Sequence, residues 1–80
     1  MIKEGFPRGR SWKDFLNLLY VEATGISISQ FDAGVRRWLV TIGRRSSPDK
    51  TTQSQRRALW VAVQDLRFDW SSGTIRPDEP

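Results

Sequence analysis

The 80-residue sequence contains no cysteine and no histidine. Without them the chain can form no disulfide, and it lacks the residues that most often hold structural zinc. It also lacks a thiolate nucleophile and the side chain that most often transfers protons near neutral pH. The remaining carboxylates, lysines and hydroxyls show no catalytic spacing, and no glycine-rich phosphate loop is present. We therefore expect a protein that is not an enzyme and that uses no cofactor or metal.

Long apolar runs are also missing. No run approaches the roughly 20 residues of a membrane-spanning helix, and the N-terminal segment MIKEGFPRGR lacks the apolar region of a secretory signal. We expect a soluble, cytoplasmic protein with no membrane partner. Because 38% of the residues are hydrophobic and 28% are charged, the chain should fold around one small core as a single domain.

Apolar residues recur at helical spacing along the first half of the chain. The first stripe consists of Trp12, Phe15, Leu16, Leu19, Tyr20 and Ala23. With Ser11 as N-cap and Gly25 as stop signal, it predicts a helix over about 11–24. The second stripe consists of Ile28, Phe31, Val35, Trp38, Leu39 and Ile42, and it predicts a helix over about 28–42. Inside this helix Gly34 indicates a close approach of another segment.

The sequence is compatible with two start positions for the third helix. Ser47-Pro48-Asp49 is typical of a helix N-terminus and predicts a helix over about 48–69. Its apolar stripe begins only later, however, with Leu59, Val63, Leu66 and Trp70, so a polar loop to about Thr52 is the alternative. The fold class expected is all-α: a compact three-helix bundle over 11–70, with a flexible arm at 1–10 and a short tail at 71–80.

Positive charge is concentrated in the middle of the chain. The net charge is +4, and ten of the thirteen basic residues are arginine, which can grip phosphate or carboxylate with two parallel hydrogen bonds. The central basic residues are Arg36, Arg37, Arg44, Arg45, Lys50, Arg56 and Arg57, and Asp49 is the one acid among them. All lie off the apolar stripes, which predicts a cationic surface for an acidic partner. Replacing Arg56 and Arg57 by alanine is accordingly expected to leave the fold intact.

The junction of the first two predicted helices has a sequence of a known kind. The segment EATGISISQF, residues 22–31, places a glycine, an apolar residue and a serine cap between two helices. This pattern resembles the turn of helix-turn-helix DNA-binding domains, and the resemblance extends over about residues 11–42. It implies that Ser29, Gln30 and Ala33 would lie nearest the bases of a duplex. An ordinary hairpin of two helices with good caps is the alternative.

Trp60 lies on the flank of the third apolar stripe, beside Arg56 and Arg57. Tryptophan with arginine is typical of interface hot spots and of base-stacking surfaces, so Trp60 is expected to contact a partner or a second copy in a homodimer. A peripheral core position is the alternative.

The sequence as a whole predicts a small basic binding protein for nucleic acid, DNA rather than RNA, acting as a regulator or accessory factor. The alternative function is a protein inhibitor or adaptor, for example from a phage or mobile element, that uses the same arginine and tryptophan side chains against an acidic protein face.

Overall fold

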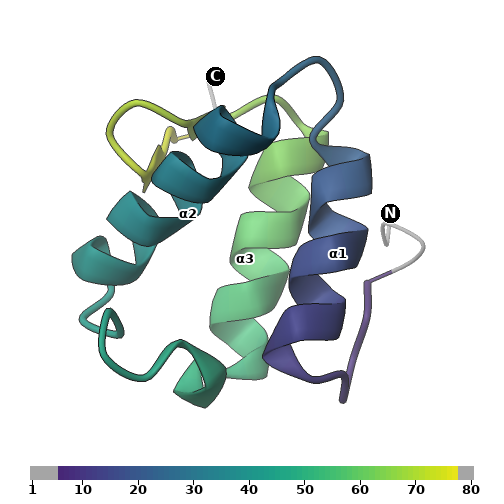
Figure 1. The fold of residues 1–80 in the computed structure, drawn as a ribbon, viewed down its shortest axis with the longest axis vertical. Coiled ribbons are helices and arrows are strands. Elements are labelled where there is room, and N and C mark those ends of the chain that lie inside the picture. Colours follow the sequence, from purple (N-terminus) through teal and green to yellow (C-terminus); the bar gives the residue numbers. More distant parts are fainter. Residues whose placement is uncertain (1–5, 78–80) are drawn as a thin grey trace.

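The computed structural model describes residues 6–77, which form three α-helices and a small β-hairpin (Figure 1). In chain order the elements are α1 (Trp12–Glu22), α2 (Ile28–Thr41), the 3-10 helix η1 (Pro48–Lys50), α3 (Gln53–Gln64), β1 (Phe68–Asp69) and β2 (Thr74–Ile75). Figure 1 shows α1 and α3 side by side, whereas α2 is inclined away from them and has the hairpin behind it. The three helices were predicted, but the fold is not strictly all-α.

The first two helices begin as their sequences predict. The Ser11 side chain accepts a hydrogen bond from the backbone N–H of Asp14 at the start of α1. At the start of α2 Ser27 and Gln30 cap each other's backbone N–H groups, which satisfies two of the donors that a helix N-terminus leaves free. Gly43 adopts a φ of +75° just after α2 and ends that helix.

The prediction of a third helix over 48–69 is wrong at both ends. Pro48 begins only the short 3-10 turn η1, and α3 starts at Gln53, where Thr52 and Gln55 form a second reciprocal cap. The alternative, a polar segment to about Thr52, is therefore the correct one. Thr52, four residues after Pro48, can act as N-cap. The backbone N–H groups of the first turn are therefore satisfied without a helix that begins at Pro48.

The C-terminal part of the predicted helix forms the hairpin instead. Phe68 pairs with Ile75 and Asp69 pairs with Thr74 in antiparallel register. The segment Ser71-Ser72-Gly73, which belongs to the predicted tail, closes this hairpin, so the part of the tail that the structure describes is folded. Most of the predicted arm, residues 1–5, and residues 78–80 of the tail lie outside the described residues.

The core fills the space between the three helices and the hairpin. Its buried hydrophobic members are Phe15, Leu19, Ala23, Phe31, Val35, Trp38, Leu39, Leu59, Trp60, Ala62, Val63 and Phe68. Trp12 and Trp70 are half-buried at its edges. Phe6 also packs on it, with its ring centroid 6.4 Å from that of Trp60, so the described end of the predicted arm is docked. Among residues 6–77 no helix is long and apolar enough to cross a membrane.

Candidate partner-binding surface on the second helix

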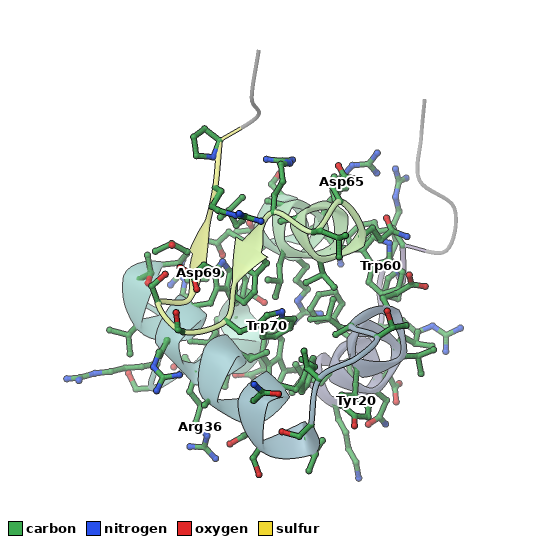
Figure 2. All side chains as sticks on the ribbon, turned by 90° about the horizontal axis from the view of Figure 1, so that it is seen from above. Tyr20, Arg36, Trp60, Asp65, Asp69 and Trp70 are labelled. Carbon is green, nitrogen blue, oxygen red and sulfur yellow. The ribbon has the colours of Figure 1, made fainter. Side chains whose placement is uncertain are left out.

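One face of α2 is buried and the opposite face is open to solvent. The buried face consists of Phe31, Gly34, Val35, Trp38 and Leu39. Arg36 and Arg37 fall between these core positions and are both exposed, as the apolar pattern predicts. Figure 2 shows Arg36 projecting away from the body of the protein. Two adjacent guanidinium groups of α2 are therefore accessible to a partner.

Arg36 is partly neutralised by a neighbour on its own helix. Its Nε lies 2.7 Å from Oδ2 of Asp32, one turn earlier, and the two side chains are 76% and 60% exposed. An acid four residues before an arginine on a helix favours such a pair. An exposed pair of this kind contributes only about 0–1 kcal/mol, so Arg36 can exchange Asp32 for another anion at little cost.

Arg37 points to the other side of α2, toward the hairpin. Its Nη1 donates a hydrogen bond of 3.4 Å to the carbonyl oxygen of Trp70. A shallow groove runs along this flank of α2, and it is lined by Ser29, Gln30, Ala33, Arg37, Trp70 and Ser71. The residues that the helix-turn-helix resemblance places nearest the bases therefore lie together. Gln30 is already engaged through Oε1, which accepts from the backbone N–H of Ser27.

Three further cations follow α2 along the chain. Arg45 and Lys50 are exposed, and among residues 6–77 neither forms an ion pair with an acid. Arg44 is half-buried, and its Nε is buried without a hydrogen-bond partner within the described part of the chain. The turn after α2 thus extends the positive charge of the helix beyond its C-terminus.

Arg56 was expected to be exposed, and this prediction is wrong. Its side chain is only 5% exposed, and its guanidinium group donates three hydrogen bonds. The acceptors are the Thr51 hydroxyl at 2.7 Å, the Arg10 carbonyl at 2.9 Å and the Asp49 carbonyl at 3.2 Å. The group also stacks over Trp12, 5.4 Å from the ring centroid. Arg56 is therefore a structural residue and is not available to a partner.

The expected contact of Trp60 with a partner is wrong, and the alternative, a position in the core, is the correct one. Trp60 is 2% exposed and belongs to the core, where its ring lies 6.3 Å from that of Phe15. No surface remains for the expected contact with a partner or a second copy. Figure 2 shows Trp60 far from Arg36, on the side of α3 and of the N-terminal segment. Arg57 lies on that side too, with its guanidinium carbon 5.8 Å from the Phe6 ring centroid.

The expected continuous cationic face is consequently smaller than the sequence suggests. The arginines that lie on α2 and on the turn directly after it are Arg36, Arg37, Arg44 and Arg45, with Arg36 and Arg37 on opposite flanks of the helix. We call this set the α2 arginine cluster. Arg56 is inside the protein and Arg57 is on another side, so neither belongs to it.

A second groove lies on the flank of α2 that faces α1, and the sequence reasoning missed it. It has a volume of about 430 Å³, and its apolar lining consists of Trp12, Leu16, Val35, Leu39 and Val40, with Pro48 at one end. Asp32, Arg36 and Arg45 provide its polar groups. The signal that could have revealed this groove is Val40, which lies beside the second apolar stripe and is 57% exposed. We call it the α1–α2 groove.

No protein-family model, curated protein or solved structure matches this chain. Its function has to be inferred from the two flanks of α2 and from the charge they carry. Among residues 6–77 there is also no group of three or more acidic side chains able to hold a metal ion.

Proposed function

We propose that this protein is a non-enzymatic nucleic-acid-binding protein that contacts phosphates through the α2 arginine cluster. The observation that supports the proposal most strongly is the exposure of Arg36, Arg37 and Arg45 along one helix and its C-terminal turn. Arginine side chains that are already in water lose little on meeting a phosphate, and each contact releases condensed counterions.

The resemblance of residues 22–31 to helix-turn-helix turns favours DNA over RNA as the partner. Its support in the structure is the shared groove of Ser29, Gln30, Ala33 and Arg37 along one flank of α2. These side chains offer a hydroxyl, an amide and a guanidinium group close together, which suits contacts to base edges and phosphates. Contacts of this kind are sufficient for a regulator or an accessory factor.

The proposal is tested by the salt dependence of binding. If all four arginines of the cluster neutralise one phosphate each, the logarithm of the association constant should fall with the logarithm of salt concentration with a slope of about −3.6 on duplex DNA. The measurement is fluorescence anisotropy with labelled duplex DNA, single-stranded DNA and duplex RNA between about 50 and 200 mM salt. Absence of binding to all three at the lowest salt would refute the proposal.

A pair of matched variants locates the contact. Arg37→Gln with Arg45→Gln removes two cations of the cluster, and the slope should fall to about −1.8. Arg8→Gln with Arg10→Gln removes two exposed cations from the N-terminal segment and should leave the slope unchanged. Equal effects of the two double variants would mean that binding follows net charge alone, and the α2 arginine cluster would lose its assigned role.

A further inference from the structure

The α1–α2 groove goes beyond the proposed function because its floor is built for apolar contact and not for phosphate. Figure 1 shows α1 and α2 joined by a short turn at one end and diverging toward the N-terminus of α1. The groove lies at the divergent end, where Trp12 and Leu16 of α1 face Val35 and Leu39 of α2. Two helices thus present apolar side chains to the same open space.

Trp12, which forms part of the floor of the groove, is fixed by contacts with buried residues. Trp12 has the Arg56 guanidinium carbon 5.4 Å from its ring centroid, and its ring lies 5.6 Å from that of Phe15, which is fully buried. Arg56 is itself fixed by three hydrogen bonds. A binding surface that is already ordered loses little side-chain entropy when a ligand arrives. The buried arginine therefore serves to hold the tryptophan that lines the groove.

The charge of the rim determines the chemistry of the occupant. Arg36 and Arg45 both line the groove, and Asp32, the only acid of its lining within residues 6–77, is already paired with Arg36. The groove therefore presents a net positive rim above an apolar floor. A nucleic acid would satisfy the rim but would leave the half-buried Leu16 and the exposed Val40 without an apolar partner. A peptide segment with an apolar row flanked by carboxylates would satisfy both the positive rim and the apolar floor of the groove.

We infer that the α1–α2 groove binds an acidic amphipathic helix of a protein partner. The apolar side chains of this helix would cover Leu16 and Val40, above the buried Leu39, and its carboxylates would pair with Arg36 and Arg45. The volume of about 430 Å³ lies within the range of ordinary ligand-binding sites, and a trough between two helices suits the helix-in-groove mode of recognition. The partner adds a helix along the side on which α1 and α2 separate.

The test uses a synthetic peptide of about 18 residues, long enough to form a helix. Leucines at helical spacing form its apolar row, glutamates flank the row, and a matched control peptide carries lysine in place of every glutamate. The readout is the methyl NMR spectrum of the full-length protein in the absence of nucleic acid. The glutamate peptide should shift the methyl signals of Leu16, Leu39 and Val40 in a saturable way. The exposed methyl groups of Val21 and Leu66 serve as internal controls and should not move.

Two variants with matched controls separate apolar from charge recognition. Val40→Glu should weaken binding of the glutamate peptide at least tenfold, whereas Val21→Glu, on the exposed side of α1, should not change it. Arg45→Glu should weaken the glutamate peptide and strengthen the lysine peptide, whereas Arg8→Glu should do neither. Because these variants replace exposed side chains, loss of binding is not loss of fold.

Three results would overturn the inference. The first is no saturable shift with the glutamate peptide at millimolar concentration. The second is equal binding of both peptides, which would mean that the groove binds apolar peptides irrespective of their charge. The third is concentration-dependent self-association that Val40→Glu abolishes, which would assign the groove to a second copy of this chain. Loss of DNA binding in the Arg37→Gln and Arg45→Gln protein tests the proposed function separately.

Discussion

Gly34 of α2 lies directly against the indole ring of Trp70 in the hairpin turn. A Cβ atom added to Gly34 would stand 2.4 Å from Cε3 of Trp70 and 3.2 Å from its backbone oxygen. Real Cβ atoms essentially never show a contact as short as 2.4 Å, so a larger residue at 34 would push the hairpin away from α2. The absence of a side chain at this position is what allows the hairpin to join the helical core.

Gly34→Ala is therefore expected to destabilise the protein, by about 1–3 kcal/mol, because overpacking forces the neighbouring segment to move. Helix propensity alone predicts the opposite sign, a gain of about 1 kcal/mol. Urea denaturation followed by circular dichroism measures the difference. In the double variant Gly34→Ala with Trp70→Leu the loss should be less than the sum of the two single losses, because the smaller side chain removes the clash. Strict additivity would contradict the contact.

Arg56 ties the start of α3 to the preceding turn at Asp49 and Thr51 and to Arg10, 46 residues earlier in the chain, and its replacement should be costly. Arg56→Lys keeps the charge but cannot reach the Thr51 hydroxyl and the Arg10 and Asp49 carbonyls together. We expect the free energy of unfolding to fall by about 2 kcal/mol or more, since hydrogen bonds to charged groups contribute about 1.5–3 kcal/mol each. Chemical denaturation of the variant and of the original protein checks this.

Arg57→Ala is the matched control for the Arg56 experiment. Arg57 is half-buried, and its guanidinium group stacks over Phe6, so its loss should cost only about 0.5–1 kcal/mol. The sequence led us to expect that Arg56 and Arg57 can both be replaced by alanine with the fold intact. For Arg56 we now expect a loss of stability instead. Equal stability of the two single variants would show that the buried hydrogen bonds contribute nothing in solution.

The sequence predicted α1 and α2 well because their apolar stripes and caps agree with each other. The buried positions of α3 are Arg56, Leu59, Trp60, Ala62 and Val63, and all but Ala62 follow one stripe at helical spacing. This stripe was visible in the sequence, but an arginine at its first position is read as polar. Only the arrangement of carbonyl oxygens around the guanidinium group in the fold makes its burial acceptable. Because this stripe was not recognised, Trp60 was predicted at the surface, whereas it lies in the core.

The hairpin could not be predicted with the same confidence from local sequence. Its strands are only two residues long, which is too short for an alternating pattern to stand out. Trp70 also continues the apparent helical stripe of Leu59, Val63 and Leu66. What decides against the helix is a tertiary contact, the fit of Trp70 on Gly34, and no single-segment pattern contains that information.

Leu66 occupies a position that normally favours glycine. Its φ is +58°, in the left-handed region, and its backbone N–H and that of Arg67 close the end of α3 by bonding the carbonyls of Val63 and Ala62. Gly43 has the same role after α2. Leu66 is 77% exposed, so its side chain gains little from burial. Leu66→Gly should raise the free energy of unfolding by about 0.5–1 kcal/mol.

Leu66→Ala is the control, because alanine shortens the side chain but keeps the unfavourable backbone conformation. Its stability should stay close to that of the original protein, while the glycine variant melts at a higher temperature. A lower melting temperature for the glycine variant would show that the leucine side chain is stabilising despite its exposure. Differential scanning calorimetry of the three proteins gives the answer.

Asp69 makes the stability of the hairpin depend on acid pH. One carboxylate oxygen accepts hydrogen bonds from the hydroxyl of Ser71 at 2.7 Å and from the backbone N–H of Ser71 at 3.0 Å. The Ser71 hydroxyl, then the Ser71 N–H and the Ser72 hydroxyl, lower the pKa of Asp69 from its ordinary value of 3.8. These bonds favour the ionised form in the folded protein.

Because the folded-state pKa is lowered, the stabilisation from Asp69 is complete above its ordinary pKa and disappears as the pH falls through the lowered value. We expect Ser71→Ala to raise the pKa of Asp69 toward 3.8, measured by NMR titration of the side-chain carboxyl carbon. We also expect Asp69→Asn to destabilise the protein at pH 6 but to show a smaller further loss below pH 4 than the original chain. A carboxyl titration that Ser71→Ala leaves unmoved would mean that the serine bonds do not persist in solution, and the acid sensitivity would then come from another carboxylate.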